Sequence, residues 1–290
     1  MNKDKVINWT IFILLSFIWG SSFILMKESS KALNGWQIAS IRIFSAGLIF
    51  LPFAVIHINQ VPRNKIGIII LSAILGNLFP AFLFAIAIYQ HVDSALAGIL
   101  NSLTPLLVIV LGILFYKSEV KARKMVGVLI GLAGLLILSV SKGGINLANF
   151  RPAMLILLAT LCYGFNVNMV GHYLKGVKPF KMATISLAFM LIPTSFFIWQ
   201  LNIIPLLIHD EGARWPIIAS ALLGVIGSAI ATALFYILIK RAGGLFASLC
   251  TYGIPVVAIF WGLWANENVT GMQVGCLALI LSGVYLANRS

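Results

Sequence analysis

Residues 66–90 read IGIIILSAILGNLFPAFLFAIAIYQ, a run of 25 residues without a single Asp, Glu, Lys or Arg. An apolar α-helix needs about 20 residues to cross the roughly 30 Å hydrocarbon core of a bilayer. This stretch is therefore long enough to span a membrane. Its few polar side chains, such as Asn77, are expensive to bury there and point to a purpose beyond anchoring.

Nine further charge-free windows fill most of the remaining chain. They cover residues 6–26, 43–62, 94–116, 125–141, 152–174, 182–208, 215–239, 242–266 and 268–288. The composition agrees, with 61% hydrophobic residues, 9% charged residues and a mean hydropathy of +1.04, whereas a soluble domain carries about 25% charged residues. We predict an all-α, polytopic membrane protein of ten transmembrane helices, with loops too short for a separate catalytic or nucleotide-binding module.

The net charge of +13 is distributed unevenly over the loops. If the N-terminus is placed in the cytoplasm and the loops alternate, 14 Lys and Arg residues fall on cytoplasmic segments and five on external ones. Basic residues concentrate on the cytoplasmic side of membrane proteins. Both termini are therefore predicted to be cytoplasmic, in a cell membrane that would be the inner membrane of a bacterium. The bilayer and a small-molecule substrate are the expected partners, and nucleic acid is not.

The chain repeats itself in several helices and in the same order. Residues 95–97, Pro105 and Gly112 correspond to residues 245–247, Pro255 and Gly262 at an offset of 150, and residues 73–76 correspond to 221–224 at an offset of 148. Each half holds five helices, so the second half must enter the membrane from the opposite side. We predict two domains, residues 1–142 and 143–290, that form an inverted 5+5 repeat of the kind common in transporters.

The duplicated series resembles the EamA repeat. It runs through Ala97, Pro105, Gly112, Glu119, Gly127 and Gly131, and again through Ala247, Pro255, Gly262, Glu267 and Gly275. The sequence Trp-Gly-Ser-Ser-Phe at 19–23, followed by Lys27, adds to the resemblance. Over essentially its whole length the chain is similar to the ten-helix EamA branch of the drug/metabolite transporter superfamily. This resemblance implies export of amino acids or other small metabolites through a central cavity, lined by helices one, three, four, six, eight and nine.

Polar and aromatic residues inside the apolar windows are the candidate substrate-binding residues. A single Ser or Thr can instead bond to the carbonyls of its own helix, whereas an Asn amide needs several partners and is the stronger indicator. The predicted substrate-binding set is Trp19, Ser22, Asn77, Phe79, Asn101, Tyr163, Asn166, Ser228, Thr232, Tyr236 and Tyr252.

Prolines and glycines recur at matching places in the two halves. Pro105 and Pro255 are predicted hinges, because proline removes a backbone donor and kinks a helix; a static kink that widens the bundle is the equal alternative. The pairs Gly127/Gly131 and Gly271/Gly275 favour close helix packing. They are a weak indication of a dimer, so a monomer is favoured.

Titratable groups are scarce at membrane depth. All seven Asp and Glu residues lie at loops or helix ends, the cysteines Cys162, Cys250 and Cys276 form no CxxC pair, and Arg42 is interpreted as a snorkelling or helix-end residue with gating as the alternative. No metal, cofactor, catalytic residue or carboxylate proton relay is expected. The sequence thus favours a transporter, not an enzyme, that exports a small neutral or zwitterionic metabolite, such as an amino acid, by alternating access.

Two other classes of protein stay open. An intramembrane enzyme would need a nucleophile and base, or a metal cluster, at membrane depth. A lipid-handling or structural membrane protein would have no solute flux, and polar residues on six helices argue lightly against it.

Overall fold

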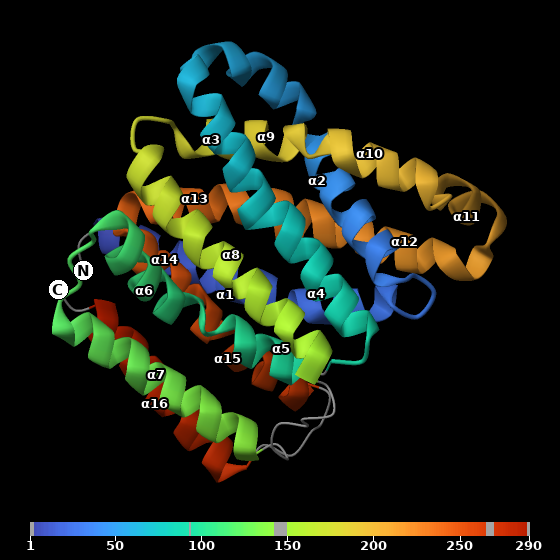
Figure 1. The fold of residues 1–290 in the computed structure, drawn as a ribbon. Coiled ribbons are helices and arrows are strands. Elements are labelled where there is room, and N and C mark those ends of the chain that lie inside the picture. Colours follow the sequence, from blue (N-terminus) through green and yellow to red (C-terminus); the bar gives the residue numbers. More distant parts are fainter. Residues whose placement is uncertain (1–2, 93, 142–149, 265–269, 289–290) are drawn as a thin grey trace.

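The computed structural model describes residues 3–92, 94–141, 150–264 and 270–288, and within these ranges the chain is helical and has no strand (Figure 1). Nine helical segments of the described chain are long and apolar enough to cross a membrane. A further helix, α7 (Ala122–Ser141), has 20 residues and a length of about 30 Å at about 1.5 Å per residue. The predicted ten-helix, all-α membrane fold is confirmed.

The first five spans contain two interruptions. They are formed by α1 (Lys3–Ser29), α2 (Gly35–His57) with the short η1 (Ile58–Gln60), α3 (Arg63–Ala73) with η2 (Ile74–Leu78) and α4 (Phe79–Tyr89), α5 (Ser94–Asn101) with α6 (Thr104–Tyr116), and α7. The η2 segment is a π-helical turn inside the third span. The fourth span is broken between α5 and α6, just before Pro105.

The last five spans show interruptions at the corresponding places and one more, between α9 and α10 at Met190, which has no counterpart in α2. They are formed by α8 (Phe150–Tyr173), α9 (Pro179–Phe189) with α10 (Leu191–Gln200), α12 (Glu211–Gly224) with η4 (Val225–Ile230) and α13 (Ala231–Ala242), α14 (Gly244–Ser248) with α15 (Cys250–Trp264), and α16 (Gly271–Asn288); α11 (Ile203–His209) is a short connecting helix. The η4 segment is again π-helical and lies in the eighth span. The predicted domain boundary at residues 142 and 143, and the acids Asp93 and Glu267, lie outside the described residues.

Side-chain caps set where several spans begin. Asn34 Oδ1 accepts a hydrogen bond from Gln37 N, and Gln37 Oε1 accepts one from Asn34 N, both at 3.0 Å. This capping box satisfies donors that the first turn of α2 leaves free. Asp210 does the same for α12 by accepting from Gly212 N at 2.9 Å.

Helices α7 and α16 lie side by side at one edge of the molecule (Figure 1). A Cβ on Gly127 would lie 2.7 Å from the Gly283 main-chain oxygen, and a Cβ on Gly283 would lie 2.6 Å from that of Gly127. The missing side chains therefore allow the two backbones to touch. The expected close packing of Gly271 and Gly275 is wrong for contacts within the chain, because nothing lies within 4 Å of a Cβ at either position; Gly283 supplies the small face of α16 toward α7.

The other eight spans surround the centre of the bundle. Helix α1 packs against α12 and α13 of the eighth span and α15 of the ninth. Helix α8 packs against α4 of the third span and α5 and α6 of the fourth. Helix α2 packs against α9 and α10 of the seventh span. Spans one, three, four, six, eight and nine thereby meet in the middle.

Candidate substrate cavity

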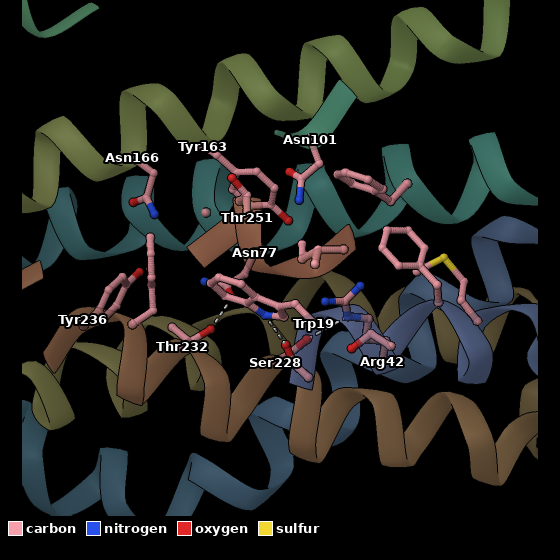
Figure 2. Close-up of a pocket in the computed structure, with 18 residues that line it drawn as sticks. Trp19, Arg42, Asn77, Asn101, Tyr163, Asn166, Ser228, Thr232, Tyr236 and Thr251 are labelled. Carbon is pink, nitrogen blue, oxygen red and sulfur yellow. Dashed lines mark hydrogen bonds between the residues drawn. The ribbon is translucent and has the colours of Figure 1, made fainter. Parts of the chain in front are cut away.

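A cavity of about 90 Å³ lies at this central meeting point (Figure 2). Its walls combine amides, hydroxyls, aromatic rings and one guanidinium. The lining residues are Trp19, Ser22, Phe23, Met26, Arg42, Gly76, Asn77, Phe84, Asn101, Tyr163, Asn166, Gly227, Ser228, Thr232, Phe235, Tyr236, Thr251 and Ile254.

Nine of the eleven residues predicted to bind substrate line this one cavity. They are Trp19, Ser22, Asn77, Asn101, Tyr163, Asn166, Ser228, Thr232 and Tyr236. The structure thus brings together side chains that lie up to 217 positions apart in the sequence. Their role in binding substrate stays a prediction, since the cavity shows only their arrangement.

Phe79 and Tyr252 lie elsewhere, which corrects the predicted set. Phe79 is 52% exposed on the outer surface. The Tyr252 hydroxyl donates to Val128 O at 2.9 Å, and its ring covers Gly131 of α7. Phe79 follows the cavity residue Asn77 by two positions, and Tyr252 follows Thr251 by one. Because a helix turns about 100° per residue, these neighbours in sequence point away from the cavity. Tyr252 therefore anchors α15 to α7.

The π-helical turns contribute residues to the cavity wall from both halves of the chain. The η2 turn presents Gly76 and Asn77, and the η4 turn presents Gly227 and Ser228. A π turn inserts an extra residue into an α-helix and often occurs at functional sites. Trp19 uses the second turn directly, because its Nε1 donates to Gly227 O at 3.3 Å. No sequence signal identified either turn.

Hydrogen bonds between spans hold the polar wall in place. Thr232 Oγ1 donates to Asn77 Oδ1 at 2.8 Å and joins the eighth span to the third. Ser72 Oγ donates to Asn166 Oδ1 at 2.6 Å and lies 3.0 Å from the Tyr236 hydroxyl. Asn166 and Tyr236 thus take part in a network that links the third, sixth and eighth spans.

Two amide atoms on the cavity wall have no hydrogen-bond partner. They are Asn77 Nδ2 and Asn101 Oδ1, on residues that are only 7% and 8% exposed. Leaving a buried donor or acceptor unsatisfied costs about 1–3 kcal/mol. A ligand that supplied an acceptor to the first and a donor to the second would recover that free energy, so the cavity has the polar character of a binding site.

The sequence position of Arg42 predicts a helix-end residue, and the structure shows that this prediction is wrong. It is the eighth residue of α2, about 10 Å along the helix at about 1.5 Å per residue, and it lines the cavity. Its Nε donates to Ser228 Oγ at 2.8 Å. Sequence reasoning missed it because arginines near helix ends usually snorkel to the interface, and only the packing of α2 against η4 shows otherwise.

The cavity residues can bind and orient a solute, but they include no general acid or base of the usual kind. No Asp, Glu or His is among the described residues that line it. In the described part of the chain, no three His, Cys, Asp or Glu side chains gather where they could hold a metal ion.

Comparison with known proteins identifies the class of protein to which this chain belongs. The chain belongs to the EamA-like transporter family, which matches residues 8–140 and again residues 151–289. The protein is therefore a multi-pass membrane transporter of the kind that the resemblance indicated.

Similar proteins cover nearly the whole chain. An uncharacterized transporter of Archaeoglobus fulgidus is 24% identical over 97% of this chain and 98% of its own length. The uncharacterized inner membrane transporter YedA of Escherichia coli is 26% identical over 94% of this chain and 87% of its own. A solved crystal structure with 17% identity superimposes with a TM-score of 0.71 over 99% of this chain and 96% of that one, which shows the shared fold alone.

Proposed function

We propose that this transporter exports a small neutral or zwitterionic metabolite, an amino acid or related compound, by alternating access through the central cavity. The observation that carries the proposal is the cavity wall itself. Two of its amide side chains each have one atom without a hydrogen-bond partner, the donor Asn77 Nδ2 and the acceptor Asn101 Oδ1, both with almost no exposed surface, and aromatic rings from spans in both halves surround them. Small-molecule sites commonly combine a few placed polar groups with apolar and aromatic walls.

The alternation would come from an inverted repeat of residues 1–142 and 143–290. Two structural correspondences support this part of the proposal. The third and eighth spans both carry π turns, and the fourth and ninth spans are both broken. The contacts of α1 with the eighth and ninth spans also correspond to those of α8 with the third and fourth. Exchanging the conformations of two such halves converts an inward-open cavity into an outward-open one.

Pro105 and Pro255 are the proposed hinges of this movement. Pro105 lies in the first turn of α6, directly after the break in the fourth span. Pro255 lies inside α15, a short distance after the break at Leu249. Helix ends and broken helices can absorb changes of backbone angle that a continuous helix resists.

Substrate flux from proteoliposomes tests the proposal. Asn101→Leu, Tyr163→Ala and Asn166→Leu should each reduce efflux of a mixed pool of the 20 standard amino acids at unchanged protein level. Tyr89→Ala is a matched control, since Tyr89 is 47% exposed at the end of α4 and does not line the cavity. Full efflux in all three cavity variants would remove the proposed site. An absence of any solute flux would favour the enzyme or lipid-handling alternatives.

A further inference from the structure

We propose that Arg42 binds the carboxylate of the transported solute, so that the substrate is a small carboxylic acid that also carries a hydrogen-bond donor, as an α-amino acid does. This inference rests on the proposed transport function and narrows its substrate class. It chooses between the neutral and the zwitterionic substrates of that function, because the sequence analysis placed Arg42 at a helix end and the structure places it in the cavity.

The guanidinium of Arg42 is held at one edge and open at the other. Its Nε donates to Ser228 Oγ at 2.8 Å, which fixes the plane of the group against η4. Among the described residues, Nη1 and Nη2 have no protein acceptor, and no Asp or Glu oxygen lies within 4.0 Å of the group. Figure 2 shows the guanidinium extending from α2 toward the cavity, beside Ser228 and below Asn101.

A charged group at this depth requires compensation. Intramembrane arginines are costly and normally pair with an acid or face water. In the described part of the chain, the salt bridges involve Lys31, Arg214 and Arg241, all at helix ends, and none reaches the cavity. A substrate carboxylate would supply the missing negative charge, and its two oxygens match the fork of two N–H donors that arginine presents.

The cavity wall at Asn101 contains an acceptor that lacks a hydrogen-bond donor. Asn101 Oδ1 is an acceptor without a partner on a residue that is 8% exposed. Because this oxygen has almost no exposed surface, the Asn101 amide must turn toward the cavity before an ammonium or hydroxyl of the solute can satisfy it. An ammonium would also be attracted to the faces of Tyr163 and Trp19. Asn77 Nδ2 offers one further donor to the carboxylate or to another acceptor of the solute.

The charge of the lining limits the substrate to one acidic group. Arg42 is the only Lys or Arg among the described residues that line the cavity. A dicarboxylate or a phosphate ester would leave negative charge uncompensated in a low-dielectric site. The apolar remainder of the wall, which includes Met26, Phe84 and Ile254, leaves space for a neutral side chain.

The first experiment compares matched solutes in wild-type proteoliposomes. Vesicles are loaded with the 20 standard amino acids, with the corresponding amino acid amides, or with a small-molecule extract of bacterial cells, and efflux is measured by mass spectrometry. We expect one or more amino acids to leave faster than from protein-free liposomes and their amides to leave no faster than from those liposomes, since the amides lack the carboxylate. Equal protein-dependent efflux of acids and amides would overturn the role of Arg42.

The cell extract separates this inference from the proposed function. If uncharged solutes or amines leave and no monocarboxylate does, the protein is a transporter and the carboxylate proposal is wrong. If nothing leaves from any of the three pools, both proposals fail.

The second experiment changes the guanidinium. Arg42→Gln should raise the half-saturating concentration of the transported acid about 10- to 100-fold, the size expected for a lost charged hydrogen bond, and Arg42→Lys should recover part of the loss. Arg214→Gln is the control, because Arg214 is exposed at the start of α12 and pairs with Glu211. Ser228→Ala should weaken binding less than Arg42→Gln, because it removes the support and keeps the charge.

Folding of each variant is followed by thermal unfolding in detergent. If Arg42→Gln does not fold, the comparison of acids with amides in the wild-type protein decides the question alone. Unchanged half-saturation in a folded Arg42→Gln protein would overturn the proposal.

Discussion

The hydroxyl of Ser102 shares its one proton between two main-chain oxygens, that of Gly98 in its own helix at 2.7 Å and that of Thr251 in the ninth span at 3.2 Å. In a regular helix the Thr251 oxygen would accept from the residue at position 255, but Pro255 has no N–H to give. The equivalent oxygen in the other half, Asn101 O, is deprived by Pro105 and accepts from Thr104 Oγ1 at 2.6 Å. Hydroxyls of the fourth span therefore satisfy the carbonyls that both prolines leave free, beside the cavity.

Replacing Ser102 with Ala should destabilise the protein by about 1–2 kcal/mol, because a buried carbonyl loses its donor. Ser248→Ala is the control: Ser248 is equally buried, but its hydroxyl bonds only to Leu245 O in the preceding turn. We expect it to change stability by less than about 0.5 kcal/mol. Reversible unfolding in mixed detergent measures both. Equal effects of the two substitutions would show that the bond between spans contributes nothing beyond a local one.

Asn101→Leu should separate stability from transport. Because Asn101 Oδ1 has no partner, removing it takes away a cost of about 1–3 kcal/mol, so the variant should be at least as stable as the wild type while its flux falls. Asn168→Leu should instead lower the stability of the protein. Its amide donates to Val108 O at 2.9 Å and to Gly164 O at 3.0 Å, so its loss should destabilise the junction of α6 and α8.

Thermal unfolding and flux are measured on the same preparations of the two Asn variants. A marked loss of stability in Asn101→Leu with normal flux would contradict the assignment of that amide to the cavity.

Much of the fold is readable from the sequence because the bilayer imposes one rule on every span. Charge-free runs near 20 residues must be helices, so the windows around Asn77 and Asn101 were placed correctly. Short interruptions within the spans leave no such signature. The π turn at Asn77 contains Gly76 and is followed by Pro80, but α2 also contains Gly47 and Pro52 and has no π turn, so these residue types do not distinguish the two cases.

The residue types that line the cavity were predictable from the sequence, but the direction in which each side chain points from its helix was less so. An amide at membrane depth needs partners wherever it points, which is why Asn77, Asn101 and Asn166 were found. An aromatic ring is stable both in lipid and in a protein core, so the sequence could not distinguish Phe79 and Tyr252 from residues that line the cavity. Arg42 required knowledge of which side of α2 faces inward.

Gly224→Ala should separate α12 from α2. A Cβ at this position would lie 2.9 Å from the Arg42 carbonyl carbon and closer still to its oxygen. Overpacking of this kind costs about 1–3 kcal/mol, and the displacement should also reduce flux because it moves Arg42. Gly67→Ala is the matched control, with nothing within 4 Å of a Cβ; it should stabilise α3 by up to about 1 kcal/mol. A stable, fully active Gly224→Ala protein would show that this close approach is dispensable.

Cysteine labelling should reveal which ends of the spans face the cytoplasm. The native Cys162, Cys250 and Cys276 are all buried, so the background is low. Ala32→Cys in the exposed α1–α2 loop should react with an impermeant maleimide added outside intact cells. Lys178→Cys, exposed between α8 and α9, should react only after the cells are opened. Reversed labelling would place both termini outside and would overturn the predicted orientation.

Transport should proceed without a proton gradient. A proton carried across the membrane needs a titratable group at depth. Of the described acids, Asp4, Glu28, Glu119, Asp210 and Glu211 lie at helix ends or loops, and Arg42 is a fixed charge that a zwitterion can neutralise at one end.

Counterflow of a transported amino acid between proteoliposome interior and medium should therefore be equally fast with the two sides at the same pH and with a protonophore present. The substrate should equilibrate and not accumulate. Accumulation against its gradient when only a pH difference is imposed would show coupling. In that case Glu28, at the last turn of α1, and His91, after α4, would be the first residues to replace.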